Sequence, residues 1–489
     1  MRGTGNVITK LVTMVRQVFH KVTPYKNIAA VERIETPLSN EMALALETWY
    51  AMYRGAAPWL EKDKVYSLNL PSFICSELAR QITLEMKWNI TGVGQDAAGN
   101  ALSNPRAEYL AAEFGRLMHN LRTRLEQGCA AGGMVVKPYP KNGHLHFDYC
   151  MDWSLYPVAF DDDGNIADVI FRDTFTDGGT IYTRLERHRL DGEDVIITQR
   201  AFKSHVKDAI GTEIPLSDVP AWADLEPEAV VRAAGGQLFG WYKVPMANTA
   251  DVDCPLGASV FDKAVGLIRD ADEQYSRIKW EYKGTELAID VDPNVLRPKK
   301  GASGGMEMPK LNDRLFRGVD LGTDDSYHIF SPAIRDTSLF NGLNNMFMRI
   351  EDLCGLSRGT ISDPNAEART ATELKIQGQR TYATVADNQA ALERCLRDVI
   401  RVMDKYADLY NLAPRGDYEV SFEWDDSIIT DSAQQLSERL TLMNAGVISP
   451  EEIRAWYLGE TQAQAKKAIE DIQKGQLERI ADALPTMSD

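Results

Sequence analysis

The sequence predicts an α+β chain in which helical segments flank an antiparallel meander of strands. Apolar residues recur at helical spacing before residue 130 and after residue 256, whereas residues 134–203 alternate β-rich runs with Asn-Gly and Asp-Gly turns. The chain has 489 residues, of which 44% are hydrophobic and 26% charged, so it can bury a sizeable core. This composition excludes wholesale disorder, collagen and a small disulfide-stapled scaffold.

The chain is acidic, with 54 Lys and Arg against 71 Asp and Glu and a formal net charge of −17. An acidic chain is a poor candidate for a protein that grips nucleic acid over its whole surface, although a local basic surface or a channel for sliding DNA stays compatible with it. The six cysteines form no CxxC pair, which fits a reducing compartment and argues against a zinc ribbon or thioredoxin-type site.

No apolar run approaches the ~18 residues that span a bilayer. Residues 7–19 read as an amphipathic helix and lack the continuous apolar core of a signal peptide. We therefore expect a soluble, intracellular chain whose first helix docks on a partner, with a membrane-surface role for that helix as the alternative.

Three helices are expected before the meander. The first, residues 39–54, begins at Ser39 as N-cap. The second has Pro71 in its first turn and runs to about Trp88, and the third, residues 106–127, stops at Gly128. In the meander, Asn-Gly and Asp-Gly pairs supply the positive φ angles that hairpin turns need. These turn signals are Asn142-Gly143, Asp163-Gly164, Asp177-Gly178-Gly179 and Asp191-Gly192.

Two helices after the meander each carry a narrow apolar seam, with spacings that alternate between 3 and 4 residues. The seams comprise Phe261, Ala264, Ile268, Ala271, Tyr275, Ile278 and Tyr282 in the first helix, and Leu339, Leu343, Met346, Ile350 and Leu353 in the second. The first helix would span roughly 28 residues and the second about 18. Narrow seams suit packing against similar helices in a bundle or ring. An irregular α/β insertion, residues 286–335, would cap this antiparallel pair.

A polar loop, residues 355–369, follows the second seam. Thr370 and Glu373 then form a capping box that starts a helix of roughly 43 residues, about 65 Å long, with Gly378 as a plausible kink. Such a helix must cross a wide domain or a large assembly. Residues 418–424 alternate as a strand, and three short helices end the chain, the second with Ser449 as N-cap.

Catalytic signatures are scarce. The sequence has no P-loop, no G-x-S-x-G and no H-E-x-x-H. His144, His146 and Asp148 would share one face of a strand and could ligate a metal, the alternative being an ordinary polar strand face. An enzyme is therefore poorly supported.

Basic residues gather in the insertion and around the polar loop. They offer weak, sequence-independent contact with phosphate, or else are ordinary solvated charges. They are Arg297, Lys299, Lys300, Lys310, Arg314 and Arg317 in the insertion, and Arg358, Arg369, Lys375 and Arg380 at and beyond the loop.

The order helix, insertion, helix, loop and long helix resembles the stem, clip, stem, tunnel loop and long helix of tailed-phage portal proteins. Three strings resemble siphophage portals of the group found in phages of Gram-positive bacteria. They are NLPSFICSELARQITLE (residues 69–85), RIKWEYKGTELAIDVD (277–292) and RTATELKIQGQRTYATV (369–385). The resemblance covers essentially the whole chain.

This resemblance implies a ring of twelve subunits at one capsid vertex, with a channel through which double-stranded DNA is packaged and ejected. It implies no catalytic activity, no cofactor and no metal. The implied partners are further copies of the chain, non-specific DNA, the terminase large subunit, the head–tail adaptor, and the major capsid and scaffolding proteins. The protein would assemble in the host cytoplasm and reside in the virion.

Mapped onto this sequence, the resemblance implies seven segments. They are a wing (1–255), a first stem helix (256–285), a clip (286–335), a second stem helix (336–354), a tunnel loop (355–369), a long wing helix and strand (370–430) and a helical C-terminal crown (431–489).

The resemblance also implies roles for particular residues. Arg358, Thr360, Asn365 and Arg369 would face the DNA channel; Lys299, Lys300, Lys310, Arg314 and Arg317 would form the clip docking surface; and Phe261, Ile268, Tyr275, Ile278, Tyr282, Leu339, Leu343, Met346 and Ile350 would pack stem subunits together. Two alternatives stay open: a metal-dependent nucleic-acid enzyme using His144, His146 and Asp148, and another virion structural protein such as an adaptor.

Overall fold

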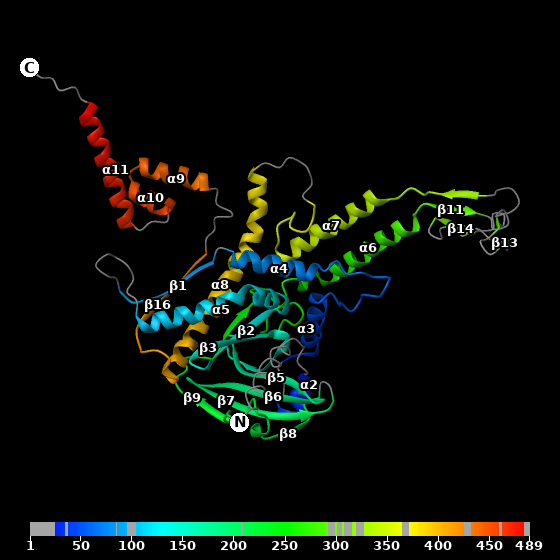
Figure 1. The fold of residues 1–489 in the computed structure, drawn as a ribbon, viewed down its shortest axis with the longest axis horizontal. Helices are drawn as coiled ribbons and strands as arrows, with labels where there is room; N and C mark the ends of the chain where they lie inside the picture. Colours follow the sequence, from blue (N-terminus) through cyan, green and yellow to red (C-terminus); the bar gives the residue numbers. More distant parts are fainter. Residues whose placement is uncertain are drawn as a thin grey trace, which may run out of the picture. The chain divides into compact units, whose positions relative to one another are not determined.

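The chain is α+β, as predicted, with helices and strands interleaved along its length (Figure 1). The computed structural model describes residues 25–34, 38–84, 86–94, 104–206, 209–291, 299–300, 306–307, 315–318, 327–363, 371–424, 432–458 and 462–483. The chain divides into two compact units, Met1–Glu423 and Trp424–Asp489.

Helices open the first unit, and local capping signals place their starts. The elements are α2 (Tyr25–Glu32), α3 (Asn40–Tyr53), α4 (Leu70–Thr83), strand β1 (Met86–Gly92) and α5 (Pro105–Ala131). Ser39 caps α3 as predicted, because its Oγ accepts the N–H of Met42 at 3.0 Å. Pro71 lies in the first turn of α4, also as predicted.

Two predicted helix ends are wrong. Helix α4 stops at Thr83, and Trp88 lies in β1, which pairs with the distant strand β16 (Tyr418–Trp424). Helix α5 continues through Gly128, where a Cβ would stand only 3.0 Å from Met134 Cβ, so glycine here serves close packing. The helix ends instead at Gly132, whose φ of +89° is the left-handed conformation of a C-cap.

The predicted meander is confirmed, but it is split between two sheets. The first has the order β10-β2-β3, and the second β4-β5-β6-β7-β8 with β9 also pairing with β7. The strands are β2 (Gly133–Lys141), β3 (His144–Met151), β4 (Leu155–Phe160), β5 (Ile166–Asp177), β6 (Thr180–Asp191), β7 (Asp194–Ser204), β8 (Thr212–Ile214), β9 (Glu228–Val231) and β10 (Gly240–Lys243), with 3₁₀ turns η1 (Asp152–Ser154) and η2 (Leu216–Asp218). Gly143, Gly164 and Gly192 adopt the positive φ that the turn signals predicted.

A buried carboxylate lies in η1, between the two sheets along the chain. Asp152 is fully buried and accepts a hydrogen bond from the indole N–H of Trp241 at 3.3 Å. A backbone hydrogen bond from Gly257 also favours its charged form. Burial dominates and raises the pKa of Asp152 from 3.8 to about 7.

Asp152 should make stability depend on pH. Between pH 3.8 and about 7 the folded chain holds a proton that the unfolded chain releases, so this contribution is present at low pH and is lost as pH rises through 7. We expect a slope of at most about 1.4 kcal/mol per pH unit. Urea unfolding at several pH values should show a flatter profile for Asp152→Asn than for the wild type; identical profiles would contradict this assignment.

The two seamed helices form an antiparallel pair within one chain (Figure 1). They are α6 (Val265–Gly284), preceded by the 3₁₀ turn η3 (Asp262–Ala264), and α7 (Asp336–Cys354). Helix α6 is shorter than predicted, at 20 residues, because residues before Asp262 are not helical. At the end of the pair where the insertion connects the two helices, Arg335 Nη2 lies 3.0 Å from Glu281 Oε2.

Short strands occupy the described part of the insertion between α6 and α7. Strand β11 (Ala288–Val291) pairs in parallel with β14 (Phe316–Gly318) and antiparallel with β15 (Tyr327–Phe330), and β12 (Lys299–Lys300) pairs with β13 (Met306–Glu307). These strands agree with the strand content expected of the α/β insertion.

Helix α8 (Ala371–Leu409) packs along β10, β2 and α4. Gly240 permits the contact with β10, because a Cβ there would stand 2.2 Å from the carbonyl oxygen of Cys395. Near the C-terminal end of α8, the buried side chain of Arg106 from α5 donates to the carboxylates of Asp404 and Asp408. The predicted cap at Thr370 lies outside the described residues.

The second unit contains the three predicted terminal helices. They are α9 (Ser432–Asn444), α10 (Pro450–Leu458) and α11 (Gln462–Ala483). The capping box of α10 is confirmed: the N–H of Ser449 donates to Glu452 Oε2 at 2.7 Å, and the N–H of Glu452 donates back to Ser449 Oγ at 3.3 Å.

Two chain-wide features complete the fold. All six cysteines are buried and unpaired. Among the residues that the structure describes, no helix combines the length and apolarity needed to cross a membrane.

Candidate functional site

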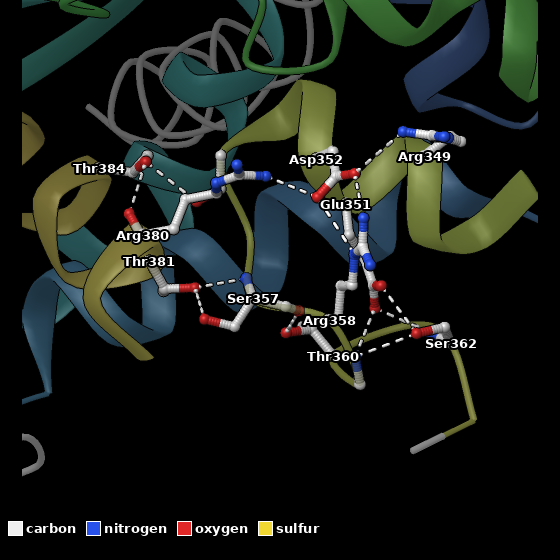
Figure 2. A network of polar contacts seen from close by, with 12 residues as sticks. Arg349, Glu351, Asp352, Ser357, Arg358, Thr360, Ser362, Arg380, Thr381 and Thr384 are labelled. Carbon is white, nitrogen blue, oxygen red and sulfur yellow. Dashed lines mark hydrogen bonds and ion pairs between the residues drawn. The ribbon is translucent and has the colours of Figure 1, made fainter. Parts of the chain in front are cut away.

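A dense polar network joins the last turns of α7, loop residues 355–363 and helix α8 (Figure 2). Two adjacent acidic residues of α7 organise it, one buried and one exposed enough to meet solvent.

Glu351 is the buried member, with no exposed surface. Its Oε1 accepts hydrogen bonds from the backbone N–H groups of Gly359, Ile361 and Ser362, at 3.2, 2.5 and 2.8 Å. Its Oε2 accepts the Ser362 hydroxyl at 2.7 Å. Hydrogen bonds to a charged acceptor are strong, so this carboxylate fixes the loop backbone against the end of α7.

The loop is also attached to α8. The backbone N–H of Ser357 donates to Thr381 Oγ1 at 2.6 Å, and Thr384 Oγ1 donates to the carbonyl of Gly355 at 2.9 Å. Gly355 has φ +69°, and a Cβ there would come within 2.4 Å of Thr384 Oγ1. Only glycine therefore fits this turn between α7 and the loop.

Asp352 is the partly exposed member, and three arginines surround it (Figure 2). Its Oδ1 lies 2.5 Å from Arg380 Nη1, and its Oδ2 lies 2.9 Å from Arg358 Nη2 and 3.8 Å from Arg349 Nη1. The hydrogen bond from Arg358, with the charge of Arg380, holds the pKa of Asp352 below its ordinary value. One partly exposed carboxylate thus faces three guanidinium groups, so positive charge exceeds negative charge among these four side chains.

A family model described as phage portal protein, SPP1 Gp6-like, matches residues 101–480, well over half of the chain. The chain belongs to this portal protein family. A search of curated proteins finds no match. The matched residues include both seam helices, the loop and α8, and therefore the whole polar network of this portal protein. The predicted membership of a siphophage-type portal family is confirmed. Portal proteins are structural, which agrees with the expectation that the chain is not an enzyme.

The structure describes only part of the predicted tunnel-loop set of this portal protein. Arg358 belongs to the Asp352 cluster. Thr360 is half-buried, and its hydroxyl donates to the carbonyl of Ser357 at 2.7 Å, so it closes a turn of the loop. Asn365 and Arg369 lie outside the described residues.

Sequence reasoning missed Arg349, Glu351 and Asp352 as members of this site. The available signal was the spacing of Arg349 and Asp352, which are three residues apart on the last turns of a helix that precedes an arginine-containing loop. No sequence pattern marks Glu351, because its burial depends on how the loop folds back over α7.

The predicted clip residues are also only partly described. Arg317 is paired within the portal subunit: its Nε donates to Asp290 Oδ1 at 2.8 Å, and its guanidinium lies 4.4 Å from the ring centroid of Phe330. Lys299 and Lys300 form β12, without a described position for their side chains, and Lys310 and Arg314 lie outside the described residues.

Several of the predicted stem-packing residues are buried within the single portal subunit. They are Phe261, Ile268, Ile278, Leu343 and Ile350. Helices α6 and α7 contact each other in this subunit, and contact of these residues with a neighbouring subunit stays a prediction. Tyr275, Leu339 and Met346 are half-buried, and Tyr282 is exposed beside Phe340.

The three residues of the alternative metal site, His144, His146 and Asp148, contact different neighbours. His144 Nδ1 lies 2.7 Å from Glu113 Oε1, and His146 stacks on Tyr139 with the ring centroids 5.5 Å apart. Asp148 stands opposite Lys137 in the β2–β3 register. Within the described residues, no group of three or more His, Cys, Asp or Glu could hold a metal ion.

Proposed function

We propose that this chain is the subunit of a twelve-membered portal ring at one capsid vertex, whose channel carries double-stranded DNA during packaging and ejection. Membership of the portal family supports the general role. The single structural observation that supports contact with DNA is the cluster of three arginines around Asp352.

The proposal assigns a segment of the chain to each part of the ring. The segments are a wing (residues 1–255), a stem made of α6 and α7 (256–285 and 336–354), a clip (286–335), a tunnel loop (355–369), a long wing helix with its strand (370–430) and a crown (431–489). The stem and clip assignments are supported by the antiparallel pairing of α6 and α7 and by the small sheet of β11, β14 and β15 in the segment that connects them.

The arginine cluster suits weak contact with passing DNA. The side chains of Arg349, Arg358 and Arg380 are 72%, 46% and 54% exposed, so phosphate oxygens can reach them. Contacts to phosphate carry no sequence information, as a conduit for any DNA requires. Twelve chains of −17 each carry about −204 in total, which opposes tight adhesion elsewhere on the ring.

Replacing all three arginines with glutamine should weaken DNA binding. We expect the slope of log affinity against log salt concentration to become shallower by up to about 3 for each subunit that contacts the duplex, because each lost phosphate contact lowers the slope by about 0.9. The measurement is fluorescence anisotropy of a short labelled duplex with the purified ring, together with DNA packaging and retention in particles. The triple lysine variant, which keeps the charge, is the control. Unchanged binding and packaging in the glutamine variant would contradict the proposed DNA contact.

The solvent-exposed side of α6 offers a surface for contact with a neighbouring subunit. Trp280 is 71% exposed and lines a shallow pocket of about 340 Å³ together with Tyr66 and Lys279. No atom lies within 4 Å of a Cβ built at Gly266 or Gly284 of the same helix, so a neighbouring subunit could approach the backbone closely there. An exposed tryptophan beside a pocket is typical of a protein contact.

Trp280→Glu should therefore impair ring assembly and shift mass from rings to monomers at equal protein concentration. A charged side chain buried in the contact would be costly, whereas Trp280→Phe keeps an aromatic surface and should still assemble. Native mass measurement of both variants checks this. Normal rings from the glutamate variant would exclude Trp280 from the subunit contact.

The clip would meet the terminase large subunit and later the head–tail adaptor, as the predicted basic set suggests. Lys299, Lys300, Lys310 and Arg314 stay proposed for this surface. Arg317 would have to leave Asp290 in order to bind a partner. The major capsid and scaffolding proteins would surround the ring in the virion after assembly in the host cytoplasm.

A further inference from the structure

We propose that Asp352 limits the strength of DNA contact by competing with DNA phosphates for the three arginines. This inference rests on the proposed function, because it assumes that DNA passes the arginine cluster. It gives Asp352 a role in the proposed DNA contact, although a negative charge by itself would repel DNA.

The contacts of Asp352 are those that a phosphate group would take. Both carboxylate oxygens are used, Oδ1 by Arg380 at 2.5 Å and Oδ2 by Arg358 at 2.9 Å. A phosphodiester likewise presents one negative charge over two free oxygens, and guanidinium groups bind both kinds of anion through the same charge-assisted hydrogen bonds. Asp352 therefore occupies donors that would otherwise be available to DNA.

The exposure of these groups permits an exchange of partner. Asp352 is 20% exposed and each arginine is about half exposed or more, so a phosphate can approach the guanidinium groups from solvent. An ion pair whose guanidinium is about half exposed is weaker than a fully buried pair. The arginines can thus turn from Asp352 to DNA and back at small cost.

The neighbouring Glu351 lets this exchange occur without disturbing the loop. It has no exposed surface and holds the loop backbone through Gly359, Ile361 and Ser362. Among the described residues, the hydrogen bonds of Glu351 come from loop residues and none comes from an arginine side chain. The two acidic residues therefore have different roles. Glu351 fixes the loop, and Asp352 binds the arginines that DNA would contact. Each contact with DNA would end when the guanidinium returns to Asp352.

The test is DNA binding by the Asp352→Asn ring over a range of salt concentrations. The asparagine has the same size but no charge, so the arginines become free to bind phosphate. We expect affinity for a short labelled duplex to rise several-fold at low salt, with a log–log salt slope steeper by about 1 for each subunit that contacts the duplex. Asp336→Asn is the matched control, because Asp336 is an exposed residue on the same helix and its loss changes the net charge equally.

The outcomes separate this inference from the proposed function. If the triple arginine-to-glutamine ring binds DNA like the wild type, the DNA site itself is wrong. If that ring loses binding, but Asp352→Asn binds no more tightly than Asp336→Asn, then Asp352 does not compete and the inference is overturned. If Asp352→Asn does not assemble, as native mass measurement would show, Asp352→Ser is used with the same expected tightening, and unchanged affinity in that ring overturns the inference equally.

Discussion

Glu351→Ala is expected to release loop residues 355–363 from α7 and to lower the free energy of unfolding by roughly 3 kcal/mol or more. The side chain is fully buried and accepts from three backbone N–H groups and one hydroxyl. Its removal takes the acceptor from the N–H groups of Ile361 and Ser362, whereas the N–H of Gly359 keeps Ser362 Oγ at 3.0 Å. Each unsatisfied buried donor costs about 1–3 kcal/mol.

Hydrogen exchange of peptides that cover residues 355–363 checks this prediction, alongside unfolding in denaturant. The matched control is Glu351→Gln, whose amide oxygen still accepts from Gly359, Ile361 and Ser362 and whose effect should be clearly smaller. Protected loop amides in the alanine variant would show that the loop is held by other contacts, such as those of Ser357 and Thr384 with α8.

Arg106→Leu is expected to destabilise the first unit by roughly 3 kcal/mol, because it removes a buried guanidinium that makes five hydrogen bonds. The guanidinium donates to the carboxylates of Asp404 and Asp408. It also donates to three backbone carbonyls, those of Asp404, Ala413 and Pro414, each at 3.0 Å. In the leucine variant Asp404 and these carbonyls lose this donor, whereas Asp408 keeps Arg415 at 3.1 Å.

The control for this prediction lies on the same helix. Arg116 is half exposed and pairs with Glu113 at 2.9 Å. Glu113 is buried but keeps His144 and the backbone N–H of Leu145 as partners, so Arg116→Leu should cost clearly less than Arg106→Leu. Arg106→Lys should fall between the two, since it keeps the charge but loses the planar fork of donors. Equal unfolding midpoints for the two leucine variants would show that Arg106 does not join α5 to the end of α8.

Features with local causes could be predicted from the sequence. Ser39 and Ser449 cap helices through bonds within four residues, and the glycines of the hairpin turns adopt the φ angles that their turns require. Features that depend on distant partners could not. Trp88 lies in a strand because β16, more than 300 residues later, pairs with it. Gly128 continues a helix because Met134 and Tyr242 pack closely against it.

The candidate site follows the same division. Arg358 could be selected from a polar loop with a basic residue, and the structure places it in the network. The role of Asp352 depends on Arg358 and Arg380, which reach it from different elements. Most seam positions are buried or half-buried, but Tyr282 and Leu353 are exposed. Helical spacing cannot distinguish a neighbouring subunit from a helix of the same chain.

The central claim, a portal ring, is tested most directly by the mass and rotational symmetry of the purified protein, from native mass measurement and averaged electron images. A closed ring of about twelve 54.6 kDa chains, roughly 655 kDa, is the predicted result. An eleven- or thirteen-fold ring would also support a portal that assembles outside the virion. A stable monomer or two-fold dimer under conditions that favour assembly would contradict the account.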